Sequence, residues 1–184
     1  MISAEFIDNV QDQDWSRTRR INIGRKTISD TPNVSVGVKS SEWKRFILKI
    51  FADGEYCCFN EMRVIGNNVV IGHVEHVHFF DPDHIIVKSI KLDGYFGHLY
   101  TPIEFGRDDI EFCLLVASAM YLYHFTNDGI ELWKSDVLGI DGVIVNHVSS
   151  KYIDVSGEWD PPGGWKETRL NIKDGTEMTD LISF

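Results

Sequence analysis

The sequence VVIGHVEHVHFFDPDHIIVKSIKLDGYFGHLY, residues 69–100, contains the pattern that most clearly indicates the fold class. β-Branched and aromatic residues fill its short apolar runs, and Pro82 and Gly94 stand in the breaks between them. Short runs of this kind, bounded by turn residues, are typical of β-strands. Asp-Gly pairs, which favour the type I′ turns of hairpins, begin at residues 53, 93, 128, 141 and 174. The chain is therefore expected to be all-β.

The same stretch has a counterpart 45 residues later. Residues 114–145, LLVASAMYLYHFTNDGIELWKSDVLGIDGVIV, align with it without gaps, with five identities and a similar apolar pattern. A period near 45 residues is the length of a four-stranded propeller blade. We expect residues 1–184 to form a single all-β domain, an antiparallel meander with a propeller-like repeat. A β-sandwich is the alternative, because residues 1–56 do not match the repeat.

Helical patterns are weak. Residues 7–20 form the best candidate for a helix, which is polar and only weakly amphipathic. A short turn is expected within residues 105–112.

The charge of the chain is uneven. The 184 residues have a net charge of −10, of which −9 falls in residues 101–184. This charge argues against general nucleic-acid binding, which needs a basic surface. No apolar run reaches the roughly 20 residues of a membrane-spanning helix, and residues 1–15 lack a signal-peptide pattern. The acidic part is either a solvated surface or a patch for a basic partner.

The three cysteines, Cys57, Cys58 and Cys113, indicate a reducing compartment. Their number is odd, and two of them are adjacent, an arrangement that rarely forms a disulfide. The spacing is not that of a zinc site. We expect a cytoplasmic protein without a cofactor.

Histidines are concentrated in residues 73–98. On one continuous strand, His76 and His78 would share a face and His73 would lie on the other. A pair of this kind can begin a metal site, so His73, His76, His78 and His98 are alternative metal ligands. The repeat offers a competing interpretation, in which His76 and His78 take the places of Tyr121 and Tyr123 on a packing face.

The loop GEWDPPGGW, residues 157–165, is the second conspicuous motif. Two prolines restrict the unfolded loop, and two glycines permit positive φ angles. A structural interpretation makes it a rigid corner with buried indoles. A functional interpretation makes it a preorganised recognition loop, because loops on rigid scaffolds commonly bind partners.

This loop, together with DGYFGHLY at 93–100 and LGIDGVIV at 138–145, resembles small bacterial β-repeat proteins of unassigned function. The resemblance covers roughly residues 66–176. It implies a bacterial source and an all-β fold, and it implies no activity.

Standard catalytic signatures, such as GxSxG, GxxxxGK[ST] and HExxH, do not occur. The favoured hypothesis is a non-catalytic module that binds a basic protein, in its most concrete form an immunity protein of a toxin–immunity pair. The expected partner-binding residues are Glu158, Trp159, Asp160, Trp165, Asp128, Asp136 and Asp141. The alternatives are metal-dependent chemistry on the histidine strand and ligand or carbohydrate binding by exposed Trp159, Trp165 and Trp133.

Overall fold

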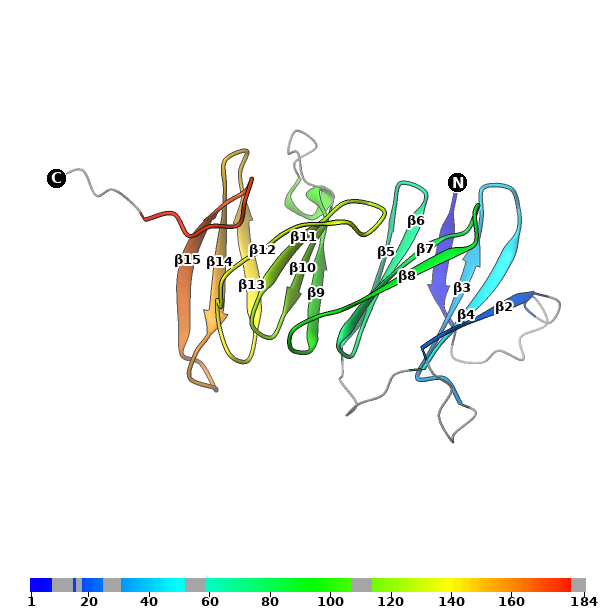
Figure 1. Cartoon of the computed structure of the whole chain (residues 1–184), viewed down its shortest axis with the longest axis horizontal. Helices are drawn as coiled ribbons and strands as arrows, with labels where there is room; N and C mark the ends of the chain where they lie inside the picture. Colours follow the sequence, from blue (N-terminus) through cyan, green and yellow to red (C-terminus); the bar gives the residue numbers. More distant parts are fainter. Residues whose placement is uncertain (8–14, 16–17, 25–30, 52–58, 107–113, 180–184) are drawn as a thin grey trace. The chain divides into compact units, whose positions relative to one another are not determined.

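A computed structural model describes residues 1–7, 15, 18–24, 31–51, 59–106 and 114–179 (Figure 1). These residues form fifteen β-strands and one short 3-10 helix, and they contain no α-helix. The prediction of an all-β fold is confirmed. The chain divides into two compact units, Met1–Ile90 and Lys91–Phe184, each containing two sheets. The single-domain assignment stays a prediction. No helix in the described part of the chain is long and apolar enough to span a membrane.

The first unit holds the first and second sheets. In spatial order, the first sheet consists of β1 (Ser3–Phe6), β3 (Val34–Lys39), β4 (Arg45–Ile50) and β2 (Arg19–Ile23). The second is a meander of β5 (Asn60–Ile65), β6 (Asn68–His73), β7 (His76–Asp81) and β8 (Ile86–Lys91). β2 and β4 pair in parallel, which departs from the antiparallel expectation.

The core of the first unit is formed by both of its sheets. Val36, Leu48 and other β-branched or large side chains of the first sheet cluster with Val69, Ile71 and Phe80 of the second. The rings of Phe46 and Phe80 meet edge to face, with centroids 5.4 Å apart. Burial of such side chains is the main stabilising contribution, at about 2 kcal/mol each. The unit is therefore sandwich-like.

The second unit holds the third and fourth sheets. In spatial order, the third consists of β12 (Glu131–Lys134), β11 (Leu122–Phe125), β10 (Leu114–Ser118) and β9 (Phe96–Tyr100). The fourth consists of β13 (Val143–Val148), β14 (Tyr152–Glu158) and β15 (Trp165–Asn171). Leu115 and Leu122 of the third sheet cluster with Val155 and Leu170 of the fourth. None of the four sheets closes into a barrel.

The strands recur at nearly the spacing of the sequence repeat. β10, β11, β12 and β13 begin 46, 46, 45 and 47 residues after β6, β7, β8 and β9. Residues 69–100 therefore begin within the second sheet and end in the third, because β9 already pairs with β10.

The expected helix at 7–20 falls largely outside the described residues, and its end, Arg19 and Arg20, belongs to β2. The expected turn at 105–112 overlaps the 3-10 helix Pro102–Phe105, and residues 107–113 are not described.

Candidate protein-interaction surface

The GEWDPPGGW loop closes the hairpin between β14 and β15, and its main chain is tightly held. Trp159 N donates to Gly164 O at 2.8 Å, and Gly164 N donates to Asp160 O at 3.0 Å. The carboxylate of Glu158 accepts a 2.7 Å hydrogen bond from Gly163 N. The loop is therefore closed by its own hydrogen bonds, so little conformational entropy remains to be lost on binding.

The two indoles of this loop are exposed. Trp159 and Trp165 have exposed fractions of 41% and 43%. Of the two interpretations of the loop, the structural one with buried indoles is wrong. Trp165 lies opposite Glu158 on the outer face of the hairpin and not on the face that packs in the core. Large aromatic side chains held in place near a surface are the side chains most often found at the centre of protein interfaces.

The segment that precedes β13 brings Asp141 to the same end of the fourth sheet. Ile140 N donates to Glu158 O at 2.7 Å, and Glu158 N donates to Gly142 O at 2.9 Å. A Cβ on Gly142 would lie 3.5 Å from the ring of Trp165. The hydroxyl of Tyr95 donates to the Asp141 carboxylate at 3.0 Å. We call Asp141, Glu158, Trp159, Asp160 and Trp165 the acidic corner.

The two other predicted partner-binding residues lie elsewhere in the unit. Asp128 is in the turn before β12, where its carboxylate accepts a hydrogen bond from Thr126 Oγ1. Asp136 follows β12, and its backbone carbonyl accepts a 2.8 Å hydrogen bond from Ser135 Oγ. Both are exposed. The structure thus brings together five of the seven predicted residues, and Asp128 and Asp136 are at opposite ends of β12.

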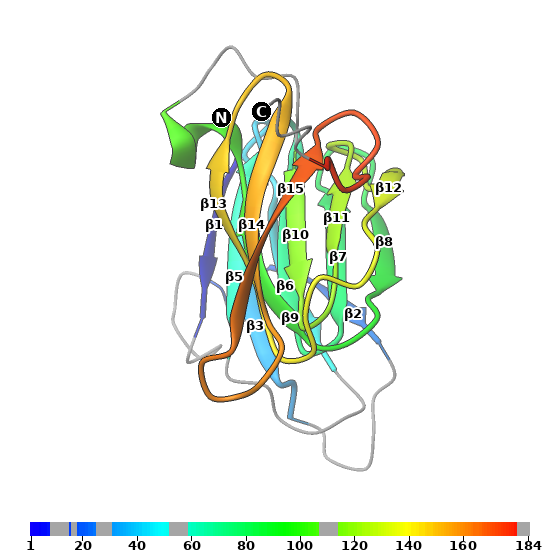
Figure 2. The same cartoon turned by 90° about the vertical axis from the view of Figure 1, so that its left-hand side faces the viewer.

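The outer face of the fourth sheet continues from the acidic corner, and the three strands of this sheet, β13, β14 and β15, are labelled in Figure 2. In β14, Ile153 and Val155 point into the core, so Asp154, Ser156 and Glu158 point outward. The face carries a shallow cavity of about 480 Å3. Its lining residues are Asn146, His147, Asp154, Ser156, Glu167, Thr168 and Arg169. Sequence reasoning missed this cavity, although the alternation in residues 152–158 is the signal that could have found the face.

An ion pair organises the middle of this face. Arg169 Nε and Nη2 donate to the two carboxylate oxygens of Asp154, at 2.7 and 3.2 Å. The guanidinium also lies 4.0 Å from the ring centroid of Tyr152. Next to it, Asn146 Nδ2 donates to Ser156 Oγ at 2.7 Å. The face already holds one guanidinium between a carboxylate and an aromatic ring.

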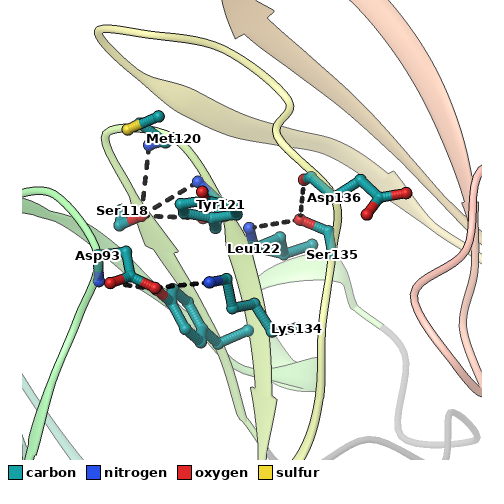
Figure 3. A network of polar contacts seen from close by, with 9 residues as sticks. Asp93, Ser118, Met120, Tyr121, Leu122, Lys134, Ser135 and Asp136 are labelled. Carbon is teal, nitrogen blue, oxygen red and sulfur yellow. Dashed lines mark hydrogen bonds and ion pairs between the residues drawn. The ribbon is translucent and has the colours of Figure 1, made fainter.

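A separate polar network joins the strands of the third sheet (Figure 3). Lys134 Nζ lies 2.5 Å from Asp93 Oδ2 and 3.9 Å from the ring centroid of Tyr121. Asp93 N donates to the hydroxyl of Tyr123 at 2.8 Å. The carboxylate of Asp93 raises the pKa of Lys134. These contacts tie β11 and β12 to the chain before β9, which is a structural role.

The histidine strand of the sequence is a hairpin in the structure. The chain turns at Val74 and Glu75, so His73 pairs with His76 across β6 and β7. Paired residues of antiparallel strands lie on the same face of the sheet, so His73 and His76 share a face. His76 and His78 are two residues apart on β7 and also share that face, and their rings stack with centroids 5.7 Å apart. The prediction that His73 lies on the opposite face is therefore wrong.

The histidines of this hairpin are engaged with neutral partners. His73 Nδ1 lies 2.5 Å from Asn60 Oδ1, and His78 Nδ1 lies 2.8 Å from Ser89 Oγ.

His98, the fourth alternative metal ligand, belongs to the second unit, where its Nε2 lies 3.6 Å from a carboxylate oxygen of Glu104. Among the residues that the structure describes, no group of three His, Cys, Asp or Glu side chains is arranged to hold a metal ion. Cys57, Cys58 and Cys113 lie outside the described residues.

Buried histidines make the stability of the fold depend on pH. Burial, with a smaller contribution from His76, lowers the pKa of His73 to about 4 and that of His78 to about 3. The unfolded chain binds these protons near pH 6.5, so protonation favours unfolding. The free energy of unfolding should be highest above about pH 6.5 and should fall as the pH decreases toward 4. At about pH 5.5 the loss is about 1.4 kcal/mol for each of these histidines, measurable by urea denaturation.

The control for this prediction is the exposed His84, whose pKa is raised by a hydrogen bond to Asp81. Protonation of His84 favours the folded state, so the variant His84→Gln should retain the loss of stability. An equal urea midpoint at about pH 7.5 and about pH 5.5 would contradict the assignment of His73 and His78 as neutral core residues.

Trp133 is not available for ligand binding. Its exposed fraction is 7%, it belongs to the core of the second unit, and its indole N–H donates to Ile172 O at 3.1 Å. The prediction of an exposed Trp133 is wrong, because β12 turns this side chain into the core. Of the three indoles proposed for carbohydrate binding, Trp159 and Trp165 remain at the surface.

Comparisons of the chain with protein-family models, with curated proteins and with solved structures found no match. Fold and surface together define an all-β protein of two sandwich-like units, with an acidic, tryptophan-bearing corner on the second.

Proposed function

We propose that the chain is a non-catalytic protein-binding module that holds a basic protein against the acidic corner. The observation that carries the proposal is the presence of two exposed indoles and three carboxylates on one internally hydrogen-bonded end of the fourth sheet. In its most concrete form, the module is a cytoplasmic bacterial immunity protein, and the partner is its cognate toxin.

The charge distribution supports a basic partner. The second unit has sixteen acidic and seven basic residues, a net charge of −9, whereas the first unit has a net charge of −1. A charge of this size on one unit accelerates the encounter with an oppositely charged protein and disfavours acidic ones. Toxins that attack nucleic acids have basic active faces, which an acidic module can cover.

The geometry of the corner supports recognition by shape. Trp159 and Trp165 flank a turn whose backbone is closed by its own hydrogen bonds, so the backbone that carries the two indoles is set before binding. Such preorganised aromatic anchors contribute to affinity, while the surrounding carboxylates contribute to specificity and to association rate.

Capture from the lysate of the source organism tests the proposal. The intact chain is immobilised and compared with a variant carrying Asp141→Asn, Glu158→Gln and Asp160→Asn. These amides keep the acceptor oxygens used by Tyr95 and Gly163. We expect one basic protein to be retained near 50 mM salt, with retention at least about tenfold lower on the variant and decreasing as salt rises.

The matched control changes the same number of charges in the same unit. The control carries Glu131→Gln, Asp174→Asn and Glu177→Gln; all three residues are exposed and lie outside the predicted binding residues, and this variant should retain the protein. Equal losses for both variants would show a general charge effect. Failure to retain a basic protein at any salt would contradict the proposed function.

A further inference from the structure

We propose that the cavity on the outer face of the fourth sheet takes an arginine or lysine side chain of the protein partner. The inference rests on the proposed function and names a second contact beside the acidic corner. The cavity of about 480 Å3 is lined by residues of β13, β14 and β15. This volume is within the range of small-ligand sites and is ample for one long side chain.

The cavity and the acidic corner lie on one continuous surface. Asp154 pairs with Arg169, Ser156 with Glu167 and Glu158 with Trp165, at successive outward positions of the same two strands. Outward positions on adjacent strands lie about 5 Å apart, and those along a strand lie about 7 Å apart. A partner that covers Trp165 therefore reaches the cavity with a neighbouring residue.

The charges of the lining favour a cation. Asp154 is occupied by Arg169 through two hydrogen bonds, so these two charges offset each other. Glu167 is exposed and makes no ion pair with the other residues that the structure describes. Glu158 lies at the next outward position of β14 after Ser156. The carboxylates of Glu158 and Glu167 therefore give the face an excess of negative charge. An anion entering the cavity would meet this excess and would have to displace Asp154 from Arg169.

Several polar groups are available to orient the incoming cation. Asn146 donates to Ser156 through its amide nitrogen, which leaves the amide oxygen as an acceptor. The Glu167 carboxylate supplies the charge, and a guanidinium can take both of its oxygens while an ammonium takes one. The existing contact of Arg169 with Tyr152 at 4.0 Å shows that this face accommodates a guanidinium over an aromatic ring.

The test uses isolated amino-acid amides and the full chain, so it does not depend on finding the partner. N-acetyl-arginine amide, N-acetyl-lysine amide and N-acetyl-glutamate are titrated separately while backbone amide resonances are followed by NMR. We expect the two cations to shift the amides of residues 146, 156 and 167–169 with millimolar affinity. Arginine should bind more tightly than lysine, and N-acetyl-glutamate should leave these amides unchanged.

The variant Glu167→Gln should weaken the binding of the arginine probe at least fivefold, and Glu131→Gln, an exposed acid on β12, should leave it unchanged. The proposal is overturned if the cations shift no cavity amide, if Glu167→Gln binds as the wild type does, or if N-acetyl-glutamate is the probe that binds. A partner captured through the corner, with no response in the cavity, would leave the proposed function standing. A response in the cavity without any captured partner would support the cation site and would contradict the proposed function.

Discussion

The variant Gly157→Ala is expected to lower the free energy of unfolding by about 3 kcal/mol. A Cβ at this position would lie 1.8 Å from the carbonyl oxygen and 2.5 Å from the carbonyl carbon of Leu138. Both are main-chain atoms, so no side-chain rotation can relieve the contact. The segment before β13 would have to move away from β14, and Leu138 would leave the core of the second unit. Urea denaturation of the purified variant measures the loss.

The same substitution should also damage the acidic corner, because Gly157 precedes Glu158. The hydrogen bonds of Glu158 with Ile140 and Gly142 depend on the close approach at Gly157. Gly142→Ala is the matched control, since its Cβ would meet only the Trp165 ring at an ordinary 3.5 Å. We expect that variant to lose less than about 1 kcal/mol. Equal stability of the two variants would contradict the described packing of residues 138–142 on β14.

Removal of both exposed indoles should have the largest effect on binding. We expect the double variant Trp159→Ala/Trp165→Ala to bind the captured basic protein at least about 30-fold more weakly, a loss of about 2 kcal/mol or more. Both side chains are more than 40% exposed, so the urea midpoint should change little. Calorimetric titration of the partner into each variant measures the affinity.

Trp43→Ala is the control for this prediction. Trp43 is 91% exposed and lies in the first unit. Its removal should leave the affinity unchanged. If Trp43→Ala weakened binding as much as the double variant, the partner would contact the first unit and the assignment of the acidic corner would be wrong.

The strands were predictable because their signals are local. Alternating or β-branched runs ended at glycine, proline or asparagine, and Gly66 does stand in the turn between β5 and β6, with a φ of +58°. The turn at Val74 and Glu75 was not predictable from composition. Val74 has a positive φ of 52°, which a β-branched residue rarely adopts. A prediction that treats residues 73–78 as one continuous strand therefore puts His73 on the wrong face.

The acidic corner was predictable in part, because its loop has a conspicuous sequence. The exposure of its indoles depends on the register of β15 against β14, which pairs Glu158 with Trp165. Trp133 has similar chemistry, yet it is buried because the sheets of the second unit pack on each other there. The cavity is formed by three strands together, and the pairing of Arg169 with Asp154 across them has no signature in either segment alone.

Hydrogen exchange of the chain, alone and with its captured partner, tests most directly where the partner binds. We expect slower exchange of the amides in residues 139–142 and 157–169 of the complex, and unchanged exchange in β3 and β4. Protection confined to the first unit, or to the Asp128 turn, would contradict the acidic corner as the binding surface.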